Sequence, residues 1–433
     1  MNYSNIFVII FLASTIFSLF LDQALEFFDY VNRLKNGSKV PKELSGIIVE
    51  EKLKRICAYE DAKYVLQIPE NVLYAGLSLL LVCGGVYAFI LKFTLQNVTQ
   101  NAFFAVFLFA LVSSVPGKIV SLPFELYREF SIEKRFGFSV MTVKMWVLDR
   151  IKDCIVLLCM TALLLSVMTL IFSVFSSSWW IFLAAAYICI SLLISLIYPL
   201  FIAPLFNKFT ALPEGELKDS LEKLLAKCGF KAKGLFVMDA SRRSRHSNAY
   251  FTGFGSAKRV VLYDTLIKQL SLQEIEAVLA HELGHYKKHH IVKRLCIMIP
   301  LVVLALFAAY RLSLSRGMLD AFGFSFLTAS YESYRTVECF AALFLLGIIF
   351  GGFGSLLGAA GNYFSRKDEF EADAFAAKIC GDGKALSDAL IKLNMENMSE
   401  ISVPKIYSVF NYNHPPLLER LRVLGYKGGG SSR

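Results

Sequence analysis

The stretch AVLAHELGHYKKHH, Ala277 to His290, places four of the six histidines of the chain within ten residues. Ser271 followed by Glu274 is typical of a capping box and predicts that a helix begins just before this stretch. On that helix His281 and His285, one turn apart, share a face and can bind one ion. Glu282, about 100° around the axis, can then reach water on the ion. The pattern H-E-x-x-H therefore predicts one zinc ion per chain, and a solvated charged helix face is the weaker interpretation.

A catalytic zinc site needs a third protein ligand, with water in the fourth position. Lys288 and Ile291 exclude the extended metzincin pattern, which requires glycine and histidine at these positions. His289 lies too far along the axis to share an ion with both His281 and His285. We interpret His289 and the adjacent His290 as part of a basic helix end at the membrane surface.

The segment SRKDEFEADAF, residues 365–375, can supply a carboxylate ligand. Glu369 and Asp373 are four residues apart on a predicted helix, where like charges repel unless a cation lies beside them. We interpret Glu369 as the third ligand and Asp373 as the acceptor of a hydrogen bond from a ligating imidazole. From the residues alone, an acidic solvated helix face remains an alternative.

The composition indicates a membrane protein, because 56% of the 433 residues are hydrophobic and only 18% are charged. Seven runs are long enough to cross a bilayer, and the first is interpreted as an uncleaved anchor and not as a signal peptide. The predicted spans are Ile6–Leu21, Val72–Leu91, Ala102–Val120, Cys154–Phe175, Trp179–Phe201, Ile291–Tyr310 and Val337–Gly361.

The loops that follow the odd-numbered spans hold most of the lysines and arginines, and the positive-inside rule places these loops in the cytoplasm. The net charge of +10 then reflects topology and contact with anionic membrane lipids. A nucleic-acid partner is not expected, because the chain has no aromatic-basic module. This topology places residues 365–375 on the same side of the membrane as His281.

Two regions outside the spans are long enough to fold. The segments GLFVMDA, NAYFTGF and RVVLYD predict short strands ahead of the histidine helix. The predicted fold is mainly α: a polytopic membrane protein with seven transmembrane helices and a small α/β zinc metalloprotease domain on the cytoplasmic side. Five glycines in the last span predict close helix packing. The predicted divisions are 1–203, 204–290, 291–365, 366–427 and a linker or tag remnant at 428–433.

The motifs HELGH, SRKDEFEADAF, SNAYFTGF and NHPPLLER together resemble those of the type I CAAX prenyl endopeptidases, which are integral-membrane zinc metalloproteases of the gluzincin group. The resemblance covers the whole chain, whereas the shorter heat-shock membrane proteases share two motifs but have fewer spans. It implies that Glu369 binds zinc and that Asp373 supports the site. It also implies that His414 and Arg420 lie close to the zinc, that Asn248 lies beside the substrate, and that the helices enclose a water-filled chamber.

The expected activity is hydrolysis of peptide bonds in C-terminal CAAX-type or membrane-associated peptides, with or without a lipid. We expect Glu282 to act as the general base and His414 to stabilise the oxyanion. We expect the substrate to pair with an edge strand, with RVVLYD as the candidate. A quality-control protease without prenyl specificity is the main alternative, and a non-proteolytic scaffold or transporter with zinc is a weaker one. A monomer is expected, in a bacterial cytoplasmic membrane or, in a eukaryote, in the endoplasmic reticulum.

Overall fold

The computed structural model describes residues 4–230, 233–252, 259–328 and 331–428. Seven helices within these ranges are long and apolar enough to cross a membrane, which confirms the predicted number. They are built on α1 (Ile6–Asn32), α2 (Glu50–Cys83), α4 (Ala102–Tyr127), α6 (Val143–Val174), α7 (Trp179–Ile197), α12 (His290–Ser313) and α15 (Tyr331–Gly351). The predicted tail at 428–433 lies outside the described residues except for Gly428.

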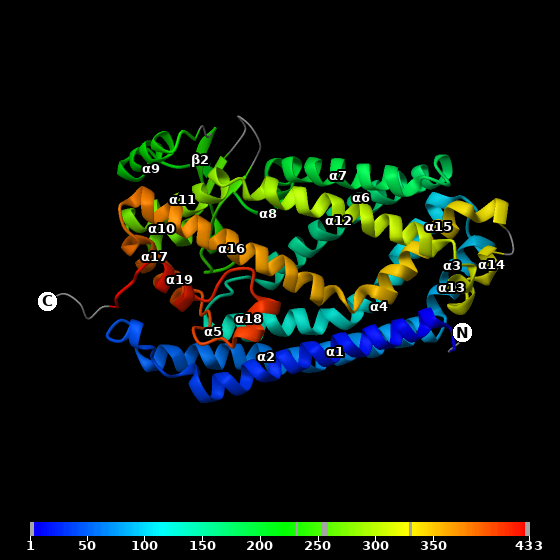
Figure 1. Ribbon diagram of the computed structural model, residues 1–433, viewed down its shortest axis with the longest axis horizontal. Helices are drawn as coiled ribbons and strands as arrows, with labels where there is room; N and C mark the ends of the chain where they lie inside the picture. Colours follow the sequence, from blue (N-terminus) through cyan, green and yellow to red (C-terminus); the bar gives the residue numbers. More distant parts are fainter. Residues whose placement is uncertain (1–3, 231–232, 253–258, 329–330, 429–433) are drawn as a thin grey trace.

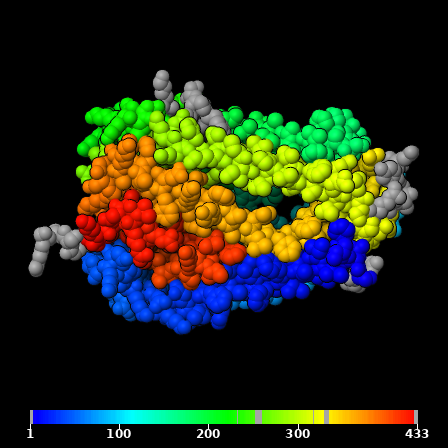
Figure 2. All heavy atoms as spheres, viewed as in Figure 1, coloured from blue at the N-terminus to red at the C-terminus, as the bar shows by residue number. Residues whose placement is uncertain are grey.

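The long helices run roughly along the long axis of the molecule, with α1 and α2 at one edge and α7 and α12 at the other (Figure 1). The strands and the C-terminal helices gather at one end, and α3 (Val86–Asn97), α13 (Arg316–Ala321) and α14 (Ser325–Thr328) lie at the opposite end. A hollow is visible between α12 and the α15–α16 chain (Figure 2). Both predicted metal-binding segments therefore lie at the same end of the helices.

The second span differs from the prediction because the chain turns at Gly84 and Gly85. Gly85 has a φ of +66°, a conformation that favours glycine. Because of this turn, the membrane-crossing helix α2 ends at Cys83, and the rest of the predicted span belongs to α3. The helix α2 begins at Glu50, well before the predicted span. The apolar sequence continues across the turn because α3 also packs into the core, where Leu91 is fully buried.

The glycines of the seventh predicted span do not provide the expected close packing. A Cβ added at any of the five would meet no atom within 4 Å; they are Gly347, Gly351, Gly354, Gly358 and Gly361. The helix breaks between α15 and α16 (Gly354–Cys380), so the four-residue spacing does not follow one straight face. The close approach is made instead by Gly352, which lies against the backbone of Ser14 in α1.

The α/β region forms one four-stranded sheet in the order β1-β2-β4-β3. The strand β2 pairs parallel with β4, and the two outer strands pair antiparallel with their neighbours. Leu221 and Leu225 pack in the same core as Val260 and Leu262 of the sheet. The elements are β1 (Phe209–Ala211), α9 (Glu216–Lys227), β2 (Gly234–Met238), η5 (Ala240–Arg242), β3 (Ala249–Thr252), β4 (Arg259–Tyr263), α10 (Asp264–Gln269) and α11 (Leu272–Lys287).

The three predicted strands are confirmed as β2, β3 and β4, but the choice of RVVLYD as an edge strand is wrong. That segment is β4 and lies between β2 and β3. Its residues Val260, Val261 and Leu262 are consecutively buried, a pattern typical of interior strands. The edge on this side of the sheet is β3.

The C-terminal region consists of α16, α17 (Lys384–Glu396), α18 (Lys405–Asn411) and α19 (Leu417–Val423). The helix α16 is followed by Gly381, whose φ of +92° ends the helix. Its first residue is Gly354, so it passes without a break from the apolar sequence into the acidic motif. The helix α19 begins directly after Pro416, and Pro415 and Pro416 both precede it.

Candidate active site

The helix α11 is fixed at its N-terminus by the predicted capping box. Glu274 N donates to Ser271 Oγ at 3.4 Å, and Ser271 N donates to Glu274 Oε2 at 2.7 Å. Lys392 of α17 also contacts the Glu274 carboxylate at 2.6 Å. Two turns further along the helix, the Nε2 atoms of His281 and His285 face each other at 3.2 Å.

The helix α16 crosses α11 at very short range. A Cβ added to Gly284 would lie 2.9 Å from Ala372 Cα, so any larger residue there would push the helices apart. This crossing brings Glu369 to both histidines, with 3.3 Å from Oε2 to His281 Nε2 and 3.2 Å from Oε1 to His285 Nε2. The glycine inside the HELGH motif thus serves the helix crossing, whereas the polar residues beside it form the cluster.

The spacing of these three residues fits a metal ion. Ligands about 2.0–2.1 Å from a tetrahedral zinc ion are about 3.3 Å apart. The two Nε2 atoms are 3.2 Å apart, each lies 3.2–3.3 Å from a different oxygen of Glu369, and one ligand atom from each residue lies within 4.8 Å of the others. The buried Oε2 atom of Glu369 lacks a partner with hydrogen-bond geometry, although His414 Nδ1 lies 2.8 Å away. A cation among His281, His285 and Glu369 would supply that partner, and no other such triad was found in the described ranges.

The charges of the cluster are strongly coupled. Burial alone would raise the pKa of Glu369, but the close contacts with His281, His285 and His414 hold it far below its usual range. Burial would lower the pKa of His281, but its hydrogen bonds to Asp373 and Glu369 raise it to about 9. A metal ion must displace this proton, so metal binding would be linked to proton release.

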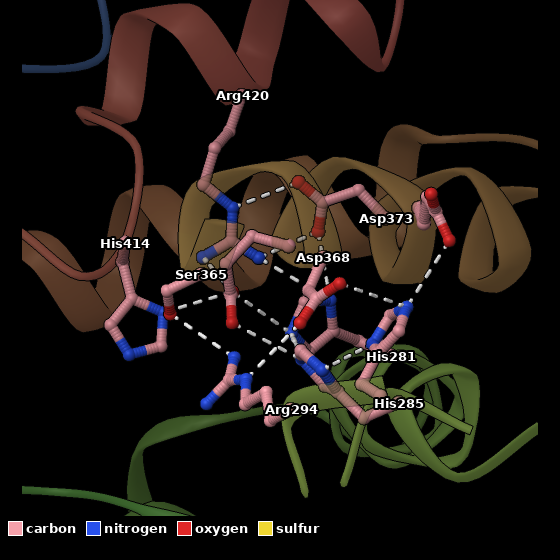
Figure 3. Close-up of polar contacts among 11 residues, drawn as sticks. His281, His285, Arg294, Ser365, Asp368, Asp373, His414 and Arg420 are labelled. Atoms are coloured by element: carbon pink, nitrogen blue, oxygen red, sulfur yellow. Dashed lines mark hydrogen bonds and ion pairs between the residues drawn. The ribbon is translucent and has the colours of Figure 1, made fainter. Parts of the chain in front are cut away.

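A buried ion pair lies behind His281. Its Nδ1 is 2.8 Å from Asp373 Oδ1, and Asp373 is fully buried. Arg420 of α19 donates to both carboxylate oxygens of Asp373, at 2.9 Å from Nε and 2.6 Å from Nη2 (Figure 3). Because an ionised carboxylate can only accept, His281 Nδ1–H donates to Asp373, and Nε2 is the ring nitrogen that faces the cluster and would release its proton to a metal ion.

A second histidine, His290, lies behind His285. The two Nδ1 atoms are 2.9 Å apart, and His290 Nε2 lies 3.2 Å from Glu371 Oε2. The helix end at His289 is confirmed, but the interpretation of His290 as a basic residue at the membrane surface is wrong, because His290 is only 1% exposed. The left-handed conformation of His289, φ 55°, turns the chain so that His290 points back to the cluster. The only sequence signal was a histidine directly after the helix end.

Glu282 and His414 flank the three clustered residues. Burial raises the pKa of Glu282, whose carboxylate has no hydrogen bond or ion pair within the described ranges. His414 lies in the loop between α18 and α19, and its side chain is 59% exposed. Arg366 supports this loop by donating to the carbonyl oxygens of Ser408 and Tyr412.

Asn248 lies apart from these contacts, at the start of β3. Its side chain is exposed and accepts a hydrogen bond from Ala249 N at 2.8 Å. Its main-chain oxygen accepts from Tyr263 N at 3.1 Å, which continues the pairing of β3 with β4. The position of Asn248 is therefore the entrance to an edge strand.

Comparison with known proteins places these features in a family. A family model of the CAAX prenyl protease N-terminal region, with five membrane helices, matches residues 30–208. The model of peptidase family M48 matches residues 211–427. These two matches cover most of the chain, including the histidine motif and the acidic motif.

Individual relatives agree with the family models. The chain is 36% identical over 397 residues to CAAX prenyl protease 1 homolog of Arabidopsis thaliana, covering 89% of this chain and 90% of the relative. It is 36% identical over 326 residues to CAAX prenyl protease 1 of Saccharomyces cerevisiae, covering 73% and 71%. The crystal structure of Ste24p from S. mikatae matches with a TM-score of 0.89 at 29% identity, covering 97% of this chain and 99% of that one.

Proposed function

Because the chain belongs to peptidase family M48 and is a multi-pass membrane metalloendopeptidase, we propose that it cleaves C-terminal CAAX-type, prenylated peptides with one zinc ion per chain. The observation that carries this proposal is the triad of His281, His285 and Glu369, which brings one ligand atom from each residue within 4.8 Å of the others, close enough to hold one ion. A half-buried glutamate without an ion pair among the described residues, Glu282, lies next to His281 in the same motif.

The proposed ligands are His281 Nε2, His285 Nε2 and one carboxylate oxygen of Glu369. Bound zinc would supply a water of lowered pKa and a Lewis acid for the peptide carbonyl. Three protein ligands leave a position open, as in catalytic zinc sites, whereas structural sites are normally closed by four. This count favours a protease over a scaffold with structural zinc.

Glu282 would take the proton of the attacking water and deliver it to the leaving amine. Its raised pKa suits this role, since a general base works best with a pKa near the operating pH. His414, exposed beside Glu369, would donate a hydrogen bond to the carbonyl oxygen as negative charge develops there. Asp373 and Arg420 would hold His281 in the tautomer that presents Nε2.

The substrate would pair with β3, the edge strand that begins directly after Asn248. An unpaired strand edge offers main-chain hydrogen bonds to an extended peptide, which suits a cleavage site near a flexible C-terminus. The basic loops at the catalytic end support an active site that faces the cytoplasm. The enzyme would act as a monomer, in the cytoplasmic membrane of a bacterium or the endoplasmic reticulum of a eukaryote.

The test is cleavage of a farnesylated CAAX peptide and of the same peptide without the lipid by purified protein, with and without chelator. We expect zinc-dependent cleavage that strongly prefers the farnesylated peptide. Equal rates on both peptides would replace the prenyl-specific proposal with a general membrane protease. Glu282→Gln should retain zinc but lose cleavage, and near-normal turnover in this variant would end the general-base assignment.

Glu369→Ala tests the third ligand separately. We expect loss of bound zinc by elemental analysis, because two imidazoles alone leave the ion with too few protein ligands. A full metal complement in this variant would assign the third ligand to another acid. Glu371→Ala is the comparison on the same helix and should keep most of the bound zinc, since Glu371 contacts His290 and Lys293 but none of the three proposed ligands.

A further inference from the structure

A surface pocket of ≈ 440 Å³ lies away from the zinc triad, at the junction between the membrane helices and the sheet domain. Its walls come from three places: the first turns of α6, the end of α8 (Ala203–Phe206) with the residues after it, and η5 with the residue that follows. The end of α8 leads directly into β1 (Figure 1). The pocket therefore joins the ends of two membrane-spanning segments to the catalytic domain.

The walls of this pocket are strongly cationic. They contain five basic side chains and one carboxylate: Lys144, Lys152, Lys208, Arg242, Arg243 and Asp149. The carboxylate of Asp149 is already paired, because Arg243 donates to both of its oxygens at 2.8 and 3.2 Å and Lys152 Nζ lies 3.7 Å away. In the part of the chain that the structure describes, Lys144, Lys208 and Arg242 form no ion pair, although all three are exposed at one pocket.

The excess of positive charge is specific to this pocket and does not simply follow from the net charge of the chain. A larger pocket of ≈ 560 Å³ lies between α9, α11 and the start of α17. Its lysines Lys223, Lys227 and Lys384 are matched in number by three carboxylates, Glu276, Asp382 and Asp388. Unlike this balanced pocket, the pocket at the membrane junction has several cations without anionic partners among the described residues, and an anion is the ligand that would satisfy them.

The position of the pocket indicates which anion it takes. The spans Val143–Val174 and Trp179–Phe206 begin and end at its walls. Leu148 and Leu205 line it with 48% of each side chain exposed, and the ring of Phe206 lies 5.8 Å from Lys152 Nζ. A phosphate carried by an acyl chain uses both the cations and this apolar wall, whereas a free phosphate uses only the cations.

We propose that this pocket binds the phosphate headgroup of an anionic membrane phospholipid. Lys144 belongs to a membrane helix, Lys208 to the linker before β1, and Arg242 to the catalytic domain. One headgroup held by all three would connect the membrane helices to η5. This element ends at Arg242, five residues before Ser247, which directly precedes Asn248. The site does not depend on the zinc cluster or on the proposed peptidase activity.

The test is native mass spectrometry of the full chain in detergent, with added phosphatidylglycerol and, separately, phosphatidylcholine. Both lipids carry a phosphodiester, but only phosphatidylglycerol has a net negative charge. We expect retained phosphatidylglycerol in the wild type and an affinity lower by about 100-fold in the triple variant Lys144→Gln, Lys208→Gln, Arg242→Gln, since each cation near a membrane surface contributes about fivefold. The triple variant Lys223→Gln, Lys227→Gln, Lys384→Gln removes the same charge from the balanced pocket and should bind as the wild type does.

Two further experiments complete the test. One variant excludes misfolding as the cause of lost binding, and competition with inorganic phosphate distinguishes a lipid headgroup from free phosphate as the ligand. The charge-conserving variant Lys144→Arg, Lys208→Arg, Arg242→Lys should keep the lipid. Displacement of the lipid by inorganic phosphate at an equal concentration would show a free-phosphate site and overturn the proposal. Equal affinity for the two lipids, or unchanged affinity in the glutamine variant of the junction pocket, would also overturn it.

Discussion

The two imidazoles that face the metal position are held in very different ways. His281 is backed by Asp373, a fully buried carboxylate that also accepts two hydrogen bonds from Arg420. His285 is backed by another histidine, His290, and only through it by an acid, Glu371, whose side chain is 34% exposed. One ligand is thus supported by a buried ion pair, and the other by a neutral relay that ends near solvent.

The difference indicates how stiff each side of the site is. Electrostatic interactions are stronger away from water, so a carboxylate held by arginine fixes the tautomer and direction of His281 firmly. The acid that supports His285 is shared with Lys293 at 2.9 Å and partly solvated, so its effect on the ligand is weaker. We therefore expect the His281 side to govern metal affinity and the His285 side to modulate it.

The largest effect should come from a change that disturbs both sides together. Gly284→Ala places a methyl group 2.9 Å from Ala372 Cα, so α16 must move relative to α11. Because a displacement of about 1 Å at a catalytic site can cost about 100-fold in rate, we expect about that loss in kcat/KM together with weaker zinc binding. The measurements are peptide cleavage at saturating zinc and zinc affinity by competition with a chelator.

Gly361→Ala is the matched control for this prediction. Gly361 lies on α16, the helix that crosses α11 at Gly284, and an added Cβ at Gly361 would meet no neighbouring atom within 4 Å. It should leave cleavage and zinc affinity unchanged. Full activity in Gly284→Ala would mean that the two helices can separate without losing the triad. The close crossing at Gly284 would then not be what positions His281, His285 and Glu369.

The next effect should come from the buried side alone. Asp373→Asn keeps the shape of the side chain but removes the charge between His281 and Arg420. Loss of such a supporting carboxylate typically costs 10–100-fold in metal affinity or activity, and burial places this case near the upper end. Zinc affinity of the purified variant measures the effect.

Asp368→Asn makes the same chemical change on the same helix. Asp368 contacts Arg294 at 3.1 Å and lies 3.6 Å from His290, with no contact to a proposed ligand among the described residues. We expect less than about threefold loss in zinc affinity. If the two asparagine variants lost affinity equally, burial of the Asp373–Arg420 pair would not be the reason for the stronger hold on His281.

The solvated side should respond more weakly. His290→Ala removes the hydrogen-bond partner of His285 Nδ1, and water can replace it because the acid beyond it is partly exposed. We expect a loss of zinc affinity of about 10-fold at most. His289→Asn is the control, since asparagine tolerates the left-handed conformation and His289 is exposed. A loss in His290→Ala as large as that in Asp373→Asn would remove the asymmetry.

The parts of this arrangement that were predictable are those encoded in local spacing. The capping box and the i, i+4 pairs place His281, His285, Glu369 and Asp373 on helix faces without further information. The seven apolar runs gave the number of membrane helices and put both motifs at one end of the molecule. The helices and the i, i+4 pairs on them therefore followed from periodicity, whereas the expected places of His414 and Arg420 near the zinc came from the family resemblance.

The parts that were not predictable depend on contacts distant in sequence. His290 joins the site only because His289 adopts a left-handed conformation and because Glu371, 81 residues further on, lies opposite. The order of the strands depends on packing against α9 and α11, so the interior position of β4 could not follow from its composition alone. The break at Gly85 was also hidden, because apolar residues continue on both sides of it.

The smallest effect on the site should come from Glu274, at the N-terminus of α11. A change there tests whether the stability of this helix can be altered without altering zinc affinity. Burial would raise the pKa of Glu274, but hydrogen bonds from Lys392 and from Ser271 hold it below its ordinary value of 4.5. A lowered pKa in the folded state means stability that is present above pH 4.5 and is lost as the pH falls through the folded value. Glu274→Gln should therefore flatten the acid side of a thermal-stability profile and cost about 1 kcal/mol near neutral pH.

Zinc affinity provides the control for this last prediction. Because Glu274 lies two turns from His281 and contacts none of the proposed ligands, Glu274→Gln should leave zinc affinity near that of the wild type at pH 7. Combined with Asp373→Asn or His290→Ala, it should lower stability further without changing the ratio of their zinc affinities, since distant sites act independently. A changed ratio would mean that the difference between the two histidines arises from the stability of α11 and not from the groups behind each ring.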